Sequence, residues 1–162
     1  MPPRPGPGDT RPVAAPLDPI DAELIRHLQA DGRRPYTQLA KEVGLSEAAV
    51  RQRVQRLLEH NVMQIVAVTD PLQLGLHRQA MILIKVEGDV RDVAAELAAF
   101  EEVDYLVMTA GSVDLIAEVV VSDDEALLQL LNDRIRKVPG VVGTESVIYL
   151  QLTKQTYQWG TR

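Results

Sequence analysis

Arginine and glutamine side chains gather in one short stretch, GLSEAAVRQRVQRLLE, at residues 44–59. Helical spacing turns Val50, Val54 and Leu57 toward one side and sets a polar group nearly opposite: Glu47, Ala48, Arg51, Gln52 and Gln55, with Arg56 at the edge. In the DNA major groove, arginine binds guanine and glutamine binds adenine in a bidentate manner. The face therefore fits a DNA recognition helix, although a solvated surface helix can have the same composition.

The turn before this stretch fits the same function. Ala40, Gly44 and Val50 are spaced like the small residue, the turn glycine and the branched plug of a helix-turn-helix. An ordinary helical hairpin can carry this spacing, but beside the arginine-rich face it favours DNA binding. Arg53 lies next to the apolar stripe, so we expect it to pair with Glu59 or a backbone carbonyl. DNA phosphate contacts are expected from Arg33, Thr37, Lys41, Ser46 and Arg56.

The charge distribution permits DNA binding although the formal net charge is -6. Residues 1–66 hold nine Lys/Arg against eight Asp/Glu, whereas residues 67–162 hold eight against fifteen. Within residues 33–60, six basic side chains stand against three acidic ones, a local excess that suits a polyanionic partner. The acidity belongs to the second part of the chain.

A second stretch with chemical potential is TAGSVDL, residues 109–115. As a hairpin turn, it would use Gly111 to supply an unusual backbone angle. As a ligand loop, it would use the Asp114 carboxylate to receive an ammonium group beside backbone amides that receive a carboxylate. Local sequence favours the hairpin turn.

Catalysis and metal binding are poorly supported. His27, His60 and His77 fall in different predicted elements, and none stands at metal-ligand spacing or beside a nucleophile pattern. We expect His27 and His60 on helix surfaces. The chain has no cysteine and no glycine-rich phosphate loop. We therefore predict no enzyme, no cofactor and no metal.

Three short helices are predicted to position the arginine-rich face. In the first, Asp18 caps the N-terminus, Pro19 takes the first position, and Gly32 follows the last turn. The second covers Pro35 to Val43, and the third begins after Ser46. Together, the three helices predict a helix-turn-helix domain of winged-helix-like type.

From residue 65 the pattern changes to strand, helix, strand, strand, helix, strand. The strands are predicted at residues 78–88, 103–110, 113–121 and 143–153, with helices at 89–100 and from Ser122 to Val138. This βαββαβ order predicts a ferredoxin-like antiparallel sheet with both helices on one face, and an α+β fold for the whole chain. The strands are apolar on both faces, so we expect a second copy to cover the open face.

The predicted organisation has five parts: a disordered Pro/Gly-rich tail (1–16), the helix-turn-helix domain (17–64), a linker strand and turn (65–76), the ferredoxin-like oligomerisation domain (77–153), and a C-terminal extension (154–162). No apolar run approaches the ~20 residues that a membrane-spanning helix needs. We expect a cytoplasmic protein.

In combination, these motifs resemble the Lrp/AsnC (feast/famine) transcriptional regulators. The resemblance rests on the Leu-Asp-x-x-Asp opening at residue 17, Asp-Gly-Arg at 31–33, Val-Gly-Leu-Ser at 43–46, Arg53, and GSVDL at 111–115. It implies a regulator built from dimers, often assembled to octamers, with a RAM domain that binds an amino acid. By this resemblance the effector site would contain Thr109, Gly111, Ser112, Asp114, Val147 and Tyr149. The chain departs from the family at Val113, often aromatic there, and at Glu47, often proline.

The sequence therefore predicts a regulator that binds specific sites on double-stranded DNA and responds to an amino acid or related small effector. Two alternatives remain open at this stage. One is an architectural DNA-compacting protein that ignores amino acids. The other is a metabolite-sensing domain, or a small enzyme, joined to a helical protein-interaction module.

Overall fold

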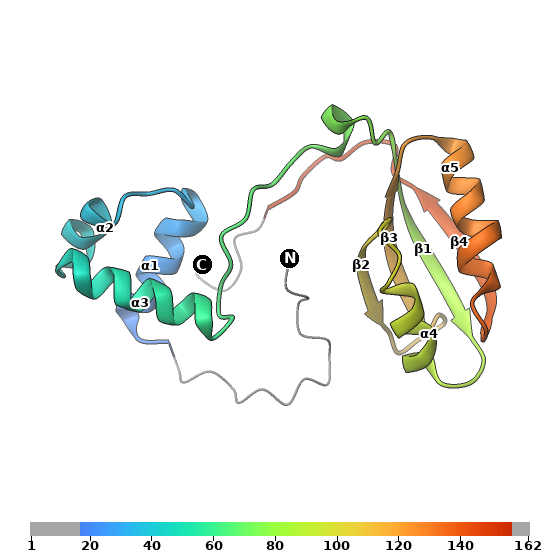
Figure 1. Ribbon diagram of the computed structural model, residues 1–162, viewed down its shortest axis with the longest axis horizontal. Helices are drawn as coiled ribbons and strands as arrows, with labels where there is room; N and C mark the ends of the chain where they lie inside the picture. The colour runs from blue at the N-terminus through green and yellow to red at the C-terminus, as the bar shows by residue number, and fades with distance from the viewer. Residues whose placement is uncertain (1–16, 157–162) are drawn as a thin grey trace. The chain divides into compact units, whose positions relative to one another are not determined.

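The computed structural model describes residues 17–156, which form two compact units (Figure 1). The second unit is Thr69–Thr153, and the first contains the described residues before and after it, 17–68 and 154–156. The predicted tail, residues 1–16, and residues 157–162 of the predicted extension lie outside the described residues. The first unit contains three helices: α1 (Pro19–Ala30), α2 (Tyr36–Val43) and α3 (Glu47–Glu59). The Asp18 side chain accepts from the Asp21 amide and caps α1, and the Ser46 side chain accepts from the Ala49 amide and caps α3, as the sequence predicted.

The connection between α2 and α3 has helix-turn-helix geometry. Gly44 ends α2 in the left-handed region with φ 69°, where glycine is favoured. Ala40 and Val50 are buried at the crossing of the two helices. The core of this unit is made of Leu24, Leu28, Leu39, Ala40, Val50 and Val54. By contrast, Gly32 has no positive φ, and α1 ends with Asp31 as its C-terminal cap.

A buried ion-pair cluster joins α1 to α3. Asp21, only 4% exposed, accepts hydrogen bonds from Arg53 at 2.8 Å and from Arg56 at 2.7 Å. Arg53 also donates to Asp18 at 2.5 Å. The predicted partners of Arg53, Glu59 or a backbone carbonyl, were wrong, because the carboxylates of α1 lie closer and are more strongly attractive. The motif Leu-Asp-x-x-Asp thus anchors the third helix.

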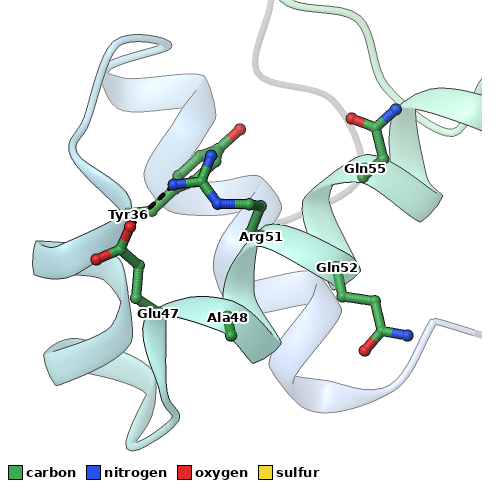
Figure 2. Close-up of a pocket in the computed structure, with 6 residues that line it drawn as sticks. All are labelled: Tyr36, Glu47, Ala48, Arg51, Gln52 and Gln55. Atoms are coloured by element: carbon green, nitrogen blue, oxygen red, sulfur yellow. Dashed lines mark hydrogen bonds and ion pairs between the residues drawn. The ribbon is translucent and has the colours of Figure 1, made fainter.

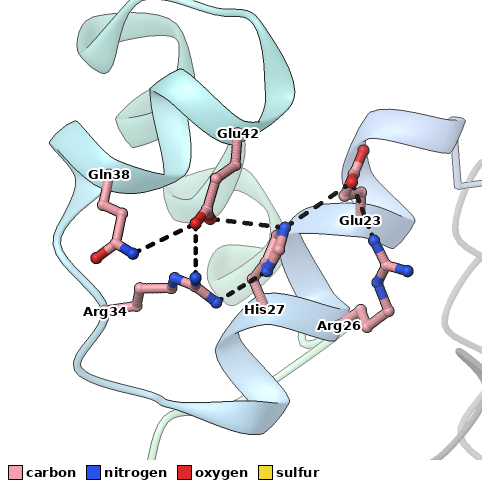
Figure 3. A network of polar contacts seen from close by, with 6 residues as sticks. All are labelled: Glu23, Arg26, His27, Arg34, Gln38 and Glu42. Atoms are coloured by element: carbon pink, nitrogen blue, oxygen red, sulfur yellow. Dashed lines mark hydrogen bonds and ion pairs between the residues drawn. The ribbon is translucent and has the colours of Figure 1, made fainter.

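A second polar network joins α1 to α2 (Figure 3). His27 was predicted on the helix surface, but its side chain is only 19% exposed. Since arginine can only donate, His27 Nδ1 accepts from Arg34 Nη1 at 3.0 Å. Arg34 also donates to Glu42 of α2 at 2.6 Å. The histidine therefore takes part in helix packing.

The predicted linker strand, residues 65–70, does not form in the described chain, although Ile65, Val66 and Val68 are apolar and exposed. Strand formation requires a hydrogen-bonded neighbour, and this segment has none among residues 17–156. A short 3-10 helix, Pro71–Leu74, follows and ends at Gly75.

The second unit is a four-stranded antiparallel sheet with helices packed on one face (Figure 1). Its elements are β1 (Arg78–Val86), α4 (Val90–Leu97), β2 (Val103–Met108), β3 (Leu115–Val121), α5 (Asp124–Gln129) and β4 (Val141–Ile148). The strand order β2-β3-β1-β4 is the predicted ferredoxin-like arrangement. Ile82 lies opposite Ala117, and Ile84 opposite Leu115; all four side chains are buried under the helices.

The last helical segment is less regular than its sequence suggested. Asp123, not Ser122, caps α5, since its carboxylate accepts from the Ala126 amide at 2.8 Å. The helix then widens into a π-helix, Leu130–Arg134, and tightens into a 3-10 turn, Ile135–Lys137. This change of pitch accompanies the burial of Leu130, Leu131 and Ile135 against the sheet.

Strand β4 ends at Ile148, five residues before its predicted end at 153. In the described sheet it is an edge strand paired with β1. The Tyr149 amide still donates to the Gln79 carbonyl, but β1 begins at Arg78, so the next residues of β4 extend past the end of β1. The length of β1 therefore sets the end of β4.

The sheet face opposite the helices is mixed in character. Met81, Leu83 and Ile116 are half-buried there, and Val147 is exposed. Near the start of β1, the Gln79 side chain donates to the Glu118 carboxylate at 2.7 Å. Burial and the neighbouring Glu118 carboxylate raise the pKa of Tyr149. A small polar group thus lies beside an apolar surface that no helix or strand among residues 17–156 covers.

Candidate nucleic-acid interface and effector loop

A hollow of about 680 Å³ lies over the outer face of α3 (Figure 2). Its lining consists of Tyr36, Glu47, Ala48, Arg51, Gln52 and Gln55. Five of these six are residues that helical spacing placed on the recognition face. The structure therefore brings them together on one exposed surface, opposite the buried side of α3 that holds the helix in place.

Arg51 is the central cation of this surface. Its guanidinium pairs with Glu47 at 2.9 Å, and its central carbon lies 5.1 Å from the centre of the Tyr36 ring. The Arg51 side chain is 64% exposed, so it remains accessible to a ligand. Gln55 donates to Glu59 at 2.9 Å, one turn further along α3. The candidate base-reading side chains of Arg51 and Gln55 are thus partly engaged with carboxylates of their own helix.

The predicted phosphate contacts are less concentrated. Arg33, Thr37 and Lys41 are exposed but lie outside the hollow. The Ser46 hydroxyl already accepts from the Ala49 amide. Arg56 pairs with Asp21 at 2.7 Å, and its side chain is still 53% exposed, so its contact with a DNA phosphate stays a prediction.

Tyr36 was missed by the sequence analysis. It stands at the start of α2, fifteen positions before Arg51, and its ring packs against the helical core. Periodicity within one helix cannot reveal a contact between two helices. The only available signal was an aromatic residue directly after the proline that opens the second predicted helix.

The predicted effector loop connects β2 to β3. Thr109 closes it twice: its amide donates to the Asp114 carbonyl at 2.9 Å, and its hydroxyl donates to the Val113 carbonyl at 2.7 Å. Gly111 and Ser112 at the tip are exposed. Gly111 has no positive φ, so the expected unusual backbone angle was wrong. The loop is a tight turn with an accessible tip.

The Asp114 side chain faces the sheet. Its Oδ2 accepts from the Val86 amide at 2.8 Å and lies 3.3 Å from Lys85 Nζ. These two contacts, the hydrogen bond from Val86 first, lower the pKa of the Asp114 carboxyl. The pairing of β1 with β4 is irregular between Lys85 and Val86, which frees the Val86 amide for this bond. Asp114 is therefore ionised and tied to β1.

Val147 and Tyr149 are far from this loop within one chain. Val147 lies opposite Met81, and the Tyr149 amide bonds to Gln79, whereas Asp114 bonds near Val86 at the other end of β1. Lys85 follows Gln79 by six positions along the strand, which corresponds to about 20 Å. A single chain does not assemble the whole predicted effector set.

Among residues 17–156 no group of three or more His, Cys, Asp or Glu side chains is arranged to hold a metal ion. In the same part of the chain, none of the helices is both long and apolar enough to cross a membrane.

A helix-turn-helix unit with an exposed arginine- and glutamine-rich helix, followed by a ferredoxin-like unit, defines a two-domain DNA-binding regulator. Residues 17–58 match the AsnC-type helix-turn-helix domain, and residues 79–159 match the Lrp/AsnC ligand binding domain. The chain therefore belongs to the Lrp/AsnC family of transcriptional regulators, which is not a family of enzymes. This assigns the helical unit to DNA binding rather than to protein interaction.

Known relatives agree over nearly the whole chain. The HTH-type transcriptional regulator FL11 of Pyrococcus horikoshii is 36% identical, covering 89% of this chain and 96% of the relative. The leucine response regulatory protein LrpA of Mycobacterium tuberculosis is 36% identical, with TM-score 0.80, covering 88% of this chain and 98% of that one. A feast or famine regulatory protein of M. tuberculosis, solved in complex with L-methionine, is 35% identical, with TM-score 0.81, covering 88% and 97%.

Proposed function

We propose that this chain binds specific DNA sites through the outer face of α3, and that an amino acid bound by the second unit changes its DNA binding or assembly. The observation that carries the first part is the exposed hollow over α3, where Arg51, Gln52 and Gln55 stand together. The observation that supports the second part is the relative of similar fold solved with L-methionine.

The DNA-binding proposal is tested with purified protein and a library of genomic fragments in a gel-shift titration. We expect some fragments to bind well above the non-specific level at moderate salt. Arg51→Ala should reduce discrimination between sequences, because arginine reads base edges. Lys41→Ala should weaken binding to all sequences and reduce the salt slope by ~1, because it contacts a phosphate. Equal losses on all sequences from both variants would contradict these roles.

Uniform, cooperative binding of every fragment, unaffected by amino acids, would instead indicate a DNA-compacting protein.

The effector proposal is tested by the thermal shift of the full chain with each of the twenty amino acids. We expect at least one amino acid, with L-methionine tested first, to raise the melting temperature. The site includes the loop of Thr109, Gly111, Ser112 and Asp114, and Val147 and Tyr149 of β4. Since the latter lie about 20 Å from the loop in one chain, they would meet it only if another copy supplies them.

Asp114→Ala should abolish the ligand response while the dimer persists. Asp133→Ala, which removes an exposed carboxylate paired with Lys137, is the matched control. An unchanged ligand response in Asp114→Ala would remove this residue from the site.

Assembly follows from the open face of the sheet. The open face of the sheet carries apolar side chains, and Ile65, Val66 and Val68 of the first unit are exposed as well. Because exposed apolar surfaces of this kind mark sites of association, we propose a homodimer that associates to octamers or other higher oligomers in the cytoplasm. Sedimentation velocity should show a species of at least twice the chain mass of 17.9 kDa. A monomer at micromolar concentration would contradict the proposal.

A further inference from the structure

The hollow over α3 contains two groups that a simple base-reading surface does not explain: the Tyr36 ring, which comes from α2, and the Glu47 carboxylate. A carboxylate on a DNA-facing surface repels phosphates, so its presence there calls for a specific role. Both groups contact the same partner, the Arg51 guanidinium (Figure 2). We infer that Tyr36 is a positioning residue and Glu47 a specificity-determining residue for the DNA base that Arg51 reads.

The role of Tyr36 follows from the geometry of arginine recognition. Bidentate binding of guanine requires the planar guanidinium to present two parallel N–H groups in the plane of the base. An exposed arginine samples many rotamers, and ordering it on binding is costly. Here the guanidinium is restrained on one side by the Tyr36 ring and at one nitrogen by Glu47. Less freedom is therefore lost when Arg51 meets its base.

Tyr36 can supply this restraint because it is itself fixed. It opens α2 directly after Pro35, whose ring limits the backbone, and its side chain packs against the core cluster of the first unit. The flexible side chain of Arg51 thus rests on a rigid one, across the crossing of α2 and α3.

The role of Glu47 follows from its second oxygen. Oε1 accepts from Arg51, whereas Oε2 has no hydrogen-bond partner among residues 17–156. A free carboxylate oxygen beside an arginine complements the major-groove edge of a G·C pair, where guanine offers O6 and N7 acceptors and cytosine offers its N4 amino donor. Arg51 and Glu47 together then prefer G·C, with the cytosine in the same or the adjacent pair. This inference rests on DNA binding through α3.

The experiment selects preferred sites for the full-length protein from a random duplex library, and then measures affinities for single-base variants of the best site. Arg51→Ala identifies the position that Arg51 reads, with an expected loss of about five- to 150-fold in discrimination there. Tyr36→Leu keeps an apolar side chain against the core but removes the ring. It should lower discrimination at that same position about two- to fivefold, with affinity for non-specific DNA unchanged.

Tyr36→Phe, which retains the ring, should restore wild-type discrimination. Glu47→Gln should raise non-specific affinity and lose the preference for cytosine at the adjoining contact. Arg26→Ala is the control, because Arg26 is an exposed arginine paired with Glu23 on α1. It should change none of these ratios, and thermal unfolding confirms that each variant is folded.

Two results would overturn the inference while leaving DNA binding intact: equal loss on every sequence in Tyr36→Leu, or an unchanged base preference in both Tyr36→Leu and Glu47→Gln. Failure of the unmodified protein to select any sequence would instead refute the proposed function itself. The two failures are therefore distinguishable.

Discussion

Removal of the Asp21 carboxylate should loosen the helix-turn-helix unit without affecting the second unit. Asp21 is 4% exposed and receives hydrogen bonds from Arg53 and Arg56, so Asp21→Ala leaves both guanidiniums without this partner. Breaking a buried ion pair by removing one partner costs about 3–5 kcal/mol. Here Arg53 keeps Asp18, and the Arg56 side chain is 53% exposed and can turn to water.

Because both arginines retain a partner or water, the expected loss in the free energy of unfolding is about 2–3 kcal/mol, near the contribution of one hydrogen bond to a charged group. Hydrogen exchange measured by mass spectrometry on the full chain is the suitable assay, because it reports each unit separately. Exchange in α1 and α3 should accelerate by about 30- to 150-fold, since ~1.4 kcal/mol corresponds to a factor of ten. Exchange in β1 and β3 should be unchanged.

Glu23→Ala is the matched control on the same helix. Glu23 pairs with Arg26, and both side chains are 40% or more exposed, so this variant should cost less than about 1 kcal/mol. Asp21→Asn, which keeps one acceptor oxygen, should accelerate hydrogen exchange by an amount between those of Glu23→Ala and Asp21→Ala. If Asp21→Ala accelerated exchange no more than Glu23→Ala, the ion-pair cluster would not be what holds α1 to α3.

Three further variants test other features. Gly44→Ala should destabilise the first unit by about 1–2 kcal/mol, because alanine is strained in the left-handed region. Steric contact adds nothing to this cost, since nothing lies within 4 Å of an added Cβ. An unchanged rate of hydrogen exchange in α2 would contradict the prediction. Gly140→Ala should cost more, since at φ 94° its Cβ would lie 3.0 Å from the Glu87 carbonyl oxygen and from Val93; a smaller shift in thermal unfolding than that of Gly44→Ala would contradict this order. The hydrogen bond from Arg53 lowers the pKa of Asp18. The stabilisation that this pair contributes is therefore present above the ordinary aspartate pKa and is lost as pH falls through the lowered value. Asp18→Asn should flatten the acid limb of the plot of stability against pH, and a plot parallel to that of the unmodified protein would refute the assignment.

The helix-turn-helix and the sheet order were predictable because local rules decide them. Asp18 and Ser46 cap helices by side-chain bonds within three residues, and Gly44 takes the only backbone region that the turn permits. The alternation of β1 and β3 fixed which residues meet under the helices. These signals lie within a few positions of one another.

Other features depend on partners distant in the sequence. The segment 65–70 has strand-like composition but no neighbouring strand, so composition alone misled. The carboxylate of Asp114 found the Val86 amide, freed by an irregularity in another strand pair, and Arg56 found Asp21, 35 positions away. Tyr36 entered the candidate DNA surface through a contact between helices. The residue pattern along a single helix or strand cannot predict such contacts between different elements.

The ion pairs of the helical unit also bear on the kinetics of encounter with DNA. Arg34, Arg51, Arg53 and Arg56 each lie beside a carboxylate of the same unit. Among the basic residues at positions 33–60, only Arg33 and Lys41 have no ion pair within the described part of the chain. The long-range field that accelerates diffusional capture by DNA is therefore weak for one copy. Selectivity in such a protein would reside in how long it stays on a site, and not in how fast it arrives.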